Sequence, residues 1–157
     1  MKRILRIMVV GLLLIASPCT MALAQNPRFG KYSNAEGVDY VCITHTMLEL
    51  MGNRKMNVNG MQLNIILNDI STILVINSDK EEYCRQMKED FEMLKADNAY
   101  EPLLTTRTDG KTASSLYKGK GKEHEFVLLN TATQGEATFV VLTGSFNAST
   151  IKMLLSE

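Results

Sequence analysis

The strongest constraint on the fold is a change of hydrophobic period near residue 100. From there to residue 144, the helical spacing is replaced by four short segments that are predicted to be β-strands. These segments are Leu103–Thr108, Lys111–Tyr117, His124–Asn130 and Ala137–Gly144. Asp109-Gly110 separates the first two segments, and this dipeptide favours the positive φ angles of a tight hairpin. The sequence therefore predicts an antiparallel meander of four strands.

A helix is predicted immediately before the meander. Ser78 and Glu81 have the spacing of a capping box, in which each side chain satisfies a backbone N–H at the start of a helix. The apolar stripe that follows consists of Cys84, Met87, Phe91 and Leu94. Recurrence at three and four residues indicates a surface helix packed against a flat layer.

The remaining elements complete an α+β pattern. Val38–Thr44 and Ser71–Asn77 are predicted strands, Thr46–Met51 is a helical turn, and Gly60–Ile70 has apolar residues at helical spacing. Asn147 is predicted to cap a last helix whose inward-facing residues are Ile151, Leu154 and Leu155. The order β-α-α-β-α-β-β-β-β-α predicts a two-layer domain, with helices packed on one face of a mostly antiparallel sheet.

We expect one buried cluster between this sheet and its helices. The residues predicted to belong to this cluster or to border it are Leu74, Ile76, Met87, Phe91, Phe126, Leu128, Phe139 and Val141. The domain is predicted to span residues 37–157, preceded by a flexible lead-in at residues 25–36 that is rich in Asn, Gly and Ser.

The chain begins with a predicted signal peptide, residues 1–24. Three basic residues precede an apolar run of ten residues, 7–16, and about 20 would be needed to cross a bilayer. Two cleavage sites compete. Lipidation of Cys19 requires a small residue before it, where Pro18 stands, whereas Ala22 and Ala24 suit the general signal peptidase. We therefore predict cleavage before Gln25 and a protein without a stable membrane anchor, located in the periplasm or outside the cell.

Cleavage changes the net charge of the chain. Removing 24 of 157 residues leaves 133, and removing three of 17 basic residues leaves 14 against 17 acidic ones, a net charge of −3. A weakly acidic chain without a basic block argues against nucleic acid or an anionic membrane as partner. An unidentified protein of the cell envelope is the expected partner.

Two cysteines, Cys42 and Cys84, remain after cleavage in an oxidising compartment. Cys84 lies on the helical stripe and Cys42 in the first predicted strand, so the two sulfurs could bond if the helix crosses that strand. The alternative is two small buried thiols that never meet.

No catalytic, metal or cofactor site is predicted. Cys42-x-x-His45 is half of a metal motif without a second half, and Glu123-His124-Glu125 opens a strand in which the histidine points away from both carboxylates. Four methionines are close in sequence: Met47, Met51, Met56 and Met61. Core packing, an adaptable partner groove and Cu(I) binding are the three interpretations of this group.

Several segments resemble a known family. They are "EGVDYV" (Glu36–Val41), "TMLELM" (Thr46–Met51), "EFVLLN" (Glu125–Asn130) and "ATFVVL" (Ala137–Leu142). The chain is similar over residues 31–157 to small exported proteins of Bacteroidetes grouped as domain of unknown function 4252. The resemblance implies a fold and a compartment but supplies no activity and no catalytic residues. Members are often encoded beside extracytoplasmic sigma-factor genes, which implies a role in envelope stress.

Two functional hypotheses follow. The first is a non-catalytic binding or accessory protein of the cell envelope. The second is a small envelope hydrolase or thiol-redox protein that uses Cys42 or Cys84.

Overall fold

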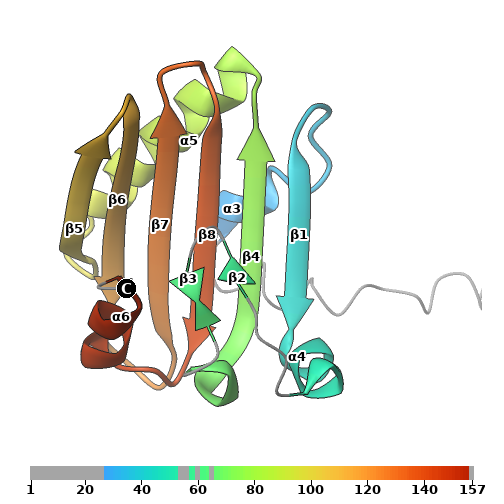
Figure 1. Ribbon diagram of the computed structural model, residues 1–157, viewed down its shortest axis with the longest axis vertical. Helices are drawn as coiled ribbons and strands as arrows, with labels where there is room; N and C mark the ends of the chain where they lie inside the picture. The colour runs from blue at the N-terminus through green and yellow to red at the C-terminus, as the bar shows by residue number, and fades with distance from the viewer. Residues whose placement is uncertain (1–26, 53–56, 59–60, 64–65, 156–157) are drawn as a thin grey trace, which may run out of the picture.

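The computed structural model describes residues 27–52, 57–58, 61–63 and 66–155, which form an α+β domain built on an antiparallel sheet (Figure 1). The six strands of this sheet are β1 (Asp39–Thr44), β4 (Ile70–Ser78), β5 (Glu101–Thr108), β6 (Lys111–Lys118), β7 (His124–Ala132) and β8 (Ala137–Gly144). Their spatial order is β1-β4-β8-β7-β6-β5, and each neighbouring pair is antiparallel. The predicted meander is therefore confirmed, with β4 inserted between β8 and β1.

Five helical segments and a small ladder complete the described structure. They are α3 (Pro27–Gly30), α4 (His45–Met51), the 3-10 helix η2 (Leu67–Asp69), α5 (Glu81–Lys95), α6 (Ala148–Leu155), and the two-stranded ladder β2 (Asn57–Val58) and β3 (Met61–Gln62). Within the described ranges, we find no helix with both the length and the apolar character needed to cross a membrane. The predicted signal peptide and its cleavage residues Ala22, Ala24 and Gln25 lie outside the described residues.

The predicted turn at Asp109-Gly110 is confirmed. Both residues have positive φ, 49° and 74°, and they join Thr108 directly to Lys111 in the β5–β6 ladder. The carbonyl of Gly110 also accepts hydrogen bonds from the N–H of Thr133 at 2.8 Å and from its hydroxyl at 2.6 Å. This contact ties the hairpin to the neighbouring β7–β8 turn.

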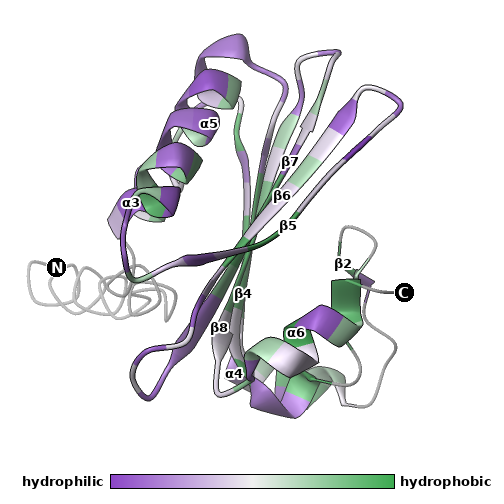
Figure 2. Ribbon diagram, turned by 90° about the vertical axis from the view of Figure 1, so that its left-hand side faces the viewer, coloured by the Kyte–Doolittle hydropathy of each residue, from purple (hydrophilic) through white to green (hydrophobic). Residues whose placement is uncertain are grey.

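The long helix α5 packs on one face of the sheet as its apolar stripe predicts (Figure 2). All four stripe residues are buried there, together with Leu74, Ile76, Phe139 and Val141 from the sheet. The segment 27–36, predicted as a flexible lead-in, belongs to the same core. Phe29 and Tyr32 are 2% and 0% exposed, because these large apolar rings fill the space beside α5.

The opposite face of the sheet carries a second core, beneath α4, α6 and the β2–β3 ladder (Figure 2). Phe126 and Leu128 belong to this second core, so the prediction that they share one cluster with Phe139 is wrong. Successive residues of a strand point to opposite faces, and central strands apolar at consecutive positions need cover on both sides. The short helices supply this second layer.

Two local predictions differ from the structure. In the described part of residues 60–70, β3 is followed by η2 and not by the predicted helix. The apolar spacing there marks burial, since Leu63 and Ile66 are core residues, while Asn68 and Asp69 are poor helix formers. Ser78 is not the helix cap. It ends β4, accepts a hydrogen bond from the Lys80 N–H and donates one to the Gly37 carbonyl.

The predicted cap of the last helix is confirmed. The Asn147 side-chain oxygen accepts a 3.0 Å hydrogen bond from the N–H of Thr150, in the first turn of α6. Ile151 and Leu154 are buried in the second core, and Leu155 packs against it.

Candidate functional site: a hydroxyl-lined groove on the sheet

The helices of the second core cover one end of their sheet face and leave the other end open (Figure 2). A row of residues directly opposite one another crosses all six strands at the open end. From β5 to β1 the row is Thr106, Ala113, Asn130, Thr138, Asn77 and Asp39. The neighbouring row toward the core is more apolar and consists of Leu104, Ser115, Leu128, Val140, Val75 and Val41. The face therefore changes from apolar to polar along the strands.

Two hollows lie on the polar row. The first, a groove of about 430 Å³, is lined by side chains of β5 to β8, among them Thr106, Thr108, Lys111, Asn130 and Thr138. The second, about 520 Å³, continues the groove at the β1 end of the row. Its lining includes Asp39, Asn77, Asp79 and Gln134. Both hollows include Glu136 in their lining, so together they extend across the sheet.

Asn77 organises the middle of this groove. With its side-chain nitrogen turned toward β8, it donates hydrogen bonds to the Thr138 hydroxyl at 2.7 Å, the Glu136 carboxylate at 3.2 Å and the Ala137 carbonyl at 3.3 Å. These bonds fix the side chains of β4 and β8 in the floor of the groove. Fixed hydroxyl and amide groups suit a ligand that offers several hydrogen-bonding groups of its own.

The charges of the groove are divided between its ends. Asp39, Asp79 and Glu136 line the β1 end, and Asp109 and Lys111 line the β5 end. The excess of carboxylates makes this surface unsuitable for phosphate backbones. Among the described residues, no group of three or more His, Cys, Asp or Glu side chains could hold a metal ion.

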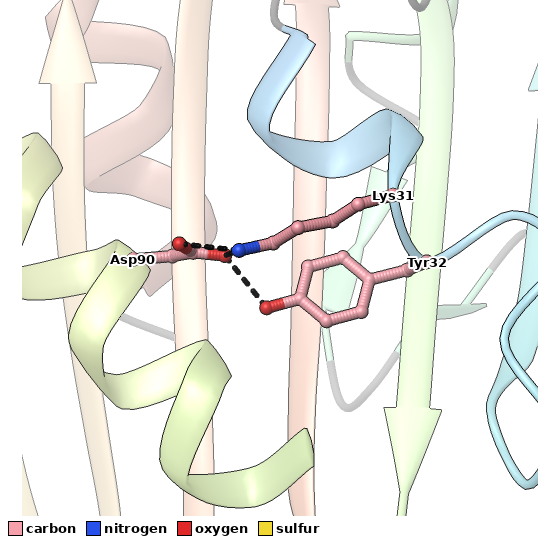
Figure 3. A network of polar contacts seen from close by, with 3 residues as sticks. All are labelled: Lys31, Tyr32 and Asp90. Carbon is pink, nitrogen blue, oxygen red and sulfur yellow. Dashed lines mark hydrogen bonds and ion pairs between the residues drawn. The ribbon is translucent and has the colours of Figure 1, made fainter. Parts of the chain in front are cut away.

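The buried polar groups elsewhere serve the fold. On the α5 side, the carboxylate of Asp90 accepts hydrogen bonds from the Tyr32 hydroxyl at 2.6 Å and from Lys31 Nζ at 2.8 Å (Figure 3). Burial, together with the hydrogen bond to the Asp90 carboxylate, raises the pKa of Tyr32. The network joins the N-terminal segment to α5.

A second tyrosine–carboxylate pair lies in the same layer. The Tyr100 hydroxyl donates a 2.5 Å hydrogen bond to Glu125, which is 5% exposed. Burial and the Glu125 charge raise the pKa of Tyr100. Because both carboxylates lie beneath the surface in contact with protein donors, they contribute to the fold and not to an open reaction site.

The two histidines are held by local contacts. Nδ1 of His124 donates to the carbonyl of Phe146 and lies 2.8 Å from the Tyr117 hydroxyl. Nδ1 of His45 lies 3.1 Å from the Ile70 carbonyl, and its Nε2 lies 3.3 Å from the Glu49 carboxylate. In the described structure, the hydrogen bonds of Cys84 go to backbone carbonyls and not to a histidine.

Of the two alternatives that the sequence left open for Cys42 and Cys84, the disulfide between them is not present. Cys84 is a buried free thiol whose Sγ donates to the carbonyls of Ser78 and Gly135, at 3.3 Å and 3.0 Å. Cys42 lies in β1 opposite Leu74. The carbonyl of Ser78 ends β4, and that of Gly135 lies in the turn between β7 and β8, so the Cys84 thiol is held at these two places.

The four methionines do not form one groove in the described structure. Met61 is 5% exposed in the second core, Met51 packs against that core, and Met47 is 51% exposed on α4. Met56 lies outside the described residues. Core packing is therefore the role of Met61 and Met51.

Sequence reasoning did not find the hydroxyl-lined groove. The available signal was four polar residues: Thr106 and Thr108 of β5, Asn130 of β7 and Thr138 of β8. They stand at strand positions whose side chains point to the same face as core residues, where apolar residues are expected. Strand order was needed to bring these positions into one row, because β4 enters the sheet from outside the meander.

Comparison with protein families assigns most of the chain to one family. The model of the family described as domain of unknown function (DUF4252) matches residues 32–154, and the chain belongs to this family. No match is found among curated proteins or among solved structures.

Proposed function

We propose that this member of the DUF4252 family is an exported, non-catalytic binding protein of the cell envelope, and that it receives its protein partner in the hydroxyl-lined groove. The observation that carries the proposal is the polar row across the open end of the sheet, with hollows of about 430 and 520 Å³ along it. An accessory role in the response to envelope stress is consistent with such a protein.

The chemistry of the groove favours an extended polar segment of a protein. Its threonine hydroxyls and amide groups can each donate or accept hydrogen bonds, as the main chain of an extended segment requires. The acidic β1 end, with Asp39, Asp79 and Glu136, favours a segment with at least one basic residue there.

The state of Cys84 argues against a thiol-based enzyme that uses this residue. A reactive thiol needs a lowered pKa and access to substrate. Burial instead raises the pKa of Cys84, and its side chain is 5% exposed. The Sγ atom is further occupied by two carbonyl acceptors.

Site-specific photocrosslinking in the native host tests the binding site. Thr105 and Thr106 are consecutive exposed residues of β5, so their side chains lie on opposite faces of the sheet. A photoreactive amino acid at Thr106 should crosslink a defined envelope protein, and the same amino acid at Thr105 should not. Asn130→Lys should abolish the Thr106 product, because a long charged side chain fills the groove. Equal products at both positions, or none at Thr106, would reject the groove.

Export is tested separately. We expect the protein in the periplasmic or extracellular fraction, with Gln25 as its first residue and no lipid attached. Mass spectrometry of the purified protein measures this directly, and a lipid mass on Cys19 would show that the processing proposal is wrong.

A further inference from the structure

The hydroxyl-lined groove runs across the strands of the sheet and not along them. Its floor is the polar row, which takes one residue from each strand between Thr106 on β5 and Asp39 on β1. The four inner strands, β6, β7, β8 and β4, each pair with a neighbour on both sides, so their backbone hydrogen bonds are used within the sheet. A segment that lies in the groove therefore contacts side chains and does not bind as an added strand.

The length of the floor sets the length of the segment that fills it. Neighbouring strands lie about 4.8 Å apart, so the five intervals across the six strands measure about 24 Å. An extended chain advances about 3.3 Å per residue, and about seven residues therefore cover this distance.

Exposed apolar side chains flank the groove at both of its ends. In the row next to the polar one, Leu104 of β5 is 39% exposed and Val41 of β1 is 50% exposed. Leu128 and Val140, in the middle of the same row, are 5% and 0% exposed. A segment that spans the sheet can bury both exposed side chains, whereas a segment confined to one end can bury one of them.

The charges along the groove give the segment a polarity. Glu136, which precedes β8, and Asp79, which follows β4, are exposed, and neither forms an ion pair with another described residue. Lys111 lies next to β5, opposite Thr108 in the ladder. Opposite charges attract across an interface and like charges repel. A basic side chain of the partner is therefore favoured over β8 and β4 and disfavoured beside Lys111.

The strand order converts this polarity into a spacing. β8 and β4 are the third and fourth strands from β5, at distances of about 14 Å and 19 Å from it. In an extended segment these distances correspond to about four and six residues, counted from the residue that contacts Thr106.

We propose that the partner segment crosses the sheet in an extended conformation over about seven residues, and that it carries a lysine or arginine about four to six residues from the residue at Thr106. This inference rests on the proposed function, because it specifies the segment that the same groove receives. The recognition is by hydroxyl and amide side chains along the floor, by apolar contacts at Leu104 and Val41, and by the Glu136 and Asp79 carboxylates.

Photocrosslinking at both ends of the row tests the span. A photoreactive amino acid is placed at Thr106 in one variant and at Asp39 in another, in the native host, and mass spectrometry locates the attachment sites on the partner. We expect one partner protein, with the two attachment sites about six to eight residues apart and a lysine or arginine between them at the stated spacing.

Four results would overturn the inference. They are attachment to different proteins, sites fewer than about four or more than about twelve residues apart, a product at Thr106 without one at Asp39, and the absence of a basic residue at the stated spacing. In each of these cases the Thr106 product still forms, so the groove remains a binding site. Loss of the Thr106 product itself would instead reject the proposed function.

Charge variants test the basic residue. Glu136→Lys should lower the yield of the Thr106 product at least about threefold, because it repels the basic side chain of the partner. Glu136→Gln removes the charge but keeps an acceptor for Asn77, so its yield should be intermediate. Glu82→Lys is the matched control, since Glu82 is an exposed carboxylate on α5, which packs on the other face of the sheet (Figure 2). Its yield should be unchanged, and equal yields from Glu136→Lys and Glu82→Lys would overturn the basic residue. Circular dichroism verifies that the variants fold.

Discussion

The hydroxyl of Tyr32 donates a 2.6 Å hydrogen bond to the carboxylate of Asp90, which joins the N-terminal segment to the middle of α5. Tyr32 is fully buried, and Asp90 is 1% exposed. Lys31 Nζ lies 2.8 Å from the same carboxylate and balances its charge. A segment of the chain that precedes the first strand is in this way a structural part of the domain.

Replacing Tyr32 by Phe should lower the free energy of unfolding by about 1.5–3 kcal/mol, because a buried carboxylate loses a donor. Urea denaturation measures the loss. Tyr83→Phe is the control: the Tyr83 ring packs at 6.5 Å from that of Tyr32, and its hydroxyl has no hydrogen bond in the described structure. It should cost less than about 0.5 kcal/mol. Equal losses would show that the bond contributes nothing.

Alkaline pH should destabilise the protein. Burial and their carboxylate partners raise the pKa of Tyr32 and Tyr100 above the ordinary 10.0, so the folded chain retains protons that the unfolded chain has lost. The stabilising contribution is therefore complete below about pH 10 and decreases at higher pH, by at most about 1.4 kcal/mol per pH unit for each tyrosine. Urea midpoints between about pH 9 and 11 measure the slope. The double variant Tyr32→Phe, Tyr100→Phe should show a shallower one; an unchanged slope would contradict this assignment.

Phe139→Ala should cost about 3–5 kcal/mol. Phe139 is fully buried, with the Phe29 ring at 5.3 Å and the Phe91 ring at 6.5 Å. Thermal and urea unfolding test this value against Leu104→Ala on the exposed edge strand, which should cost less than about 1 kcal/mol. A loss below about 1 kcal/mol for Phe139→Ala would mean that the cavity collapses without penalty.

Gly144→Ala should destabilise the protein by more than about 3 kcal/mol. A Cβ atom at this position would lie 1.9 Å from the Asp69 carbonyl oxygen, and that oxygen also accepts a 2.8 Å hydrogen bond from the Ser145 N–H. The backbone cannot move away without losing this bond. Ser145→Ala, an exposed neighbour, should be close to neutral in the same unfolding measurement.

Cys84 should be inert in the folded protein. Its thiol has a raised pKa and little exposure, so a thiol reagent at neutral pH should modify it only after unfolding. Mass spectrometry of alkylated peptides, with and without denaturant, measures the modification at Cys84. Rapid modification of Cys84 in the native state would restore the thiol-based hypothesis.

The sequence determined the features that depend on neighbouring residues. The period of two fixed the strands of the meander, Asp109-Gly110 fixed its first hairpin, and the stripe from Cys84 to Leu94 fixed the face of α5. Asn147 likewise marked the start of α6. Each of these follows from local backbone geometry and from the side on which apolar groups recur.

The tertiary structure alone decided which distant residues meet. The sequence predicts that Phe126 and Phe139 are both core residues, yet they lie on opposite faces of the sheet. Strand pairing decides which residues of neighbouring strands lie on the same face. The sheet order placed Asn77 beside Thr138 and created the polar row, and it kept Cys84 among carbonyls of β4 and the β7–β8 turn. Strands far apart in sequence pair so that the apolar residues of both sheet faces are buried together. A local sequence pattern does not specify which strands become neighbours in this way.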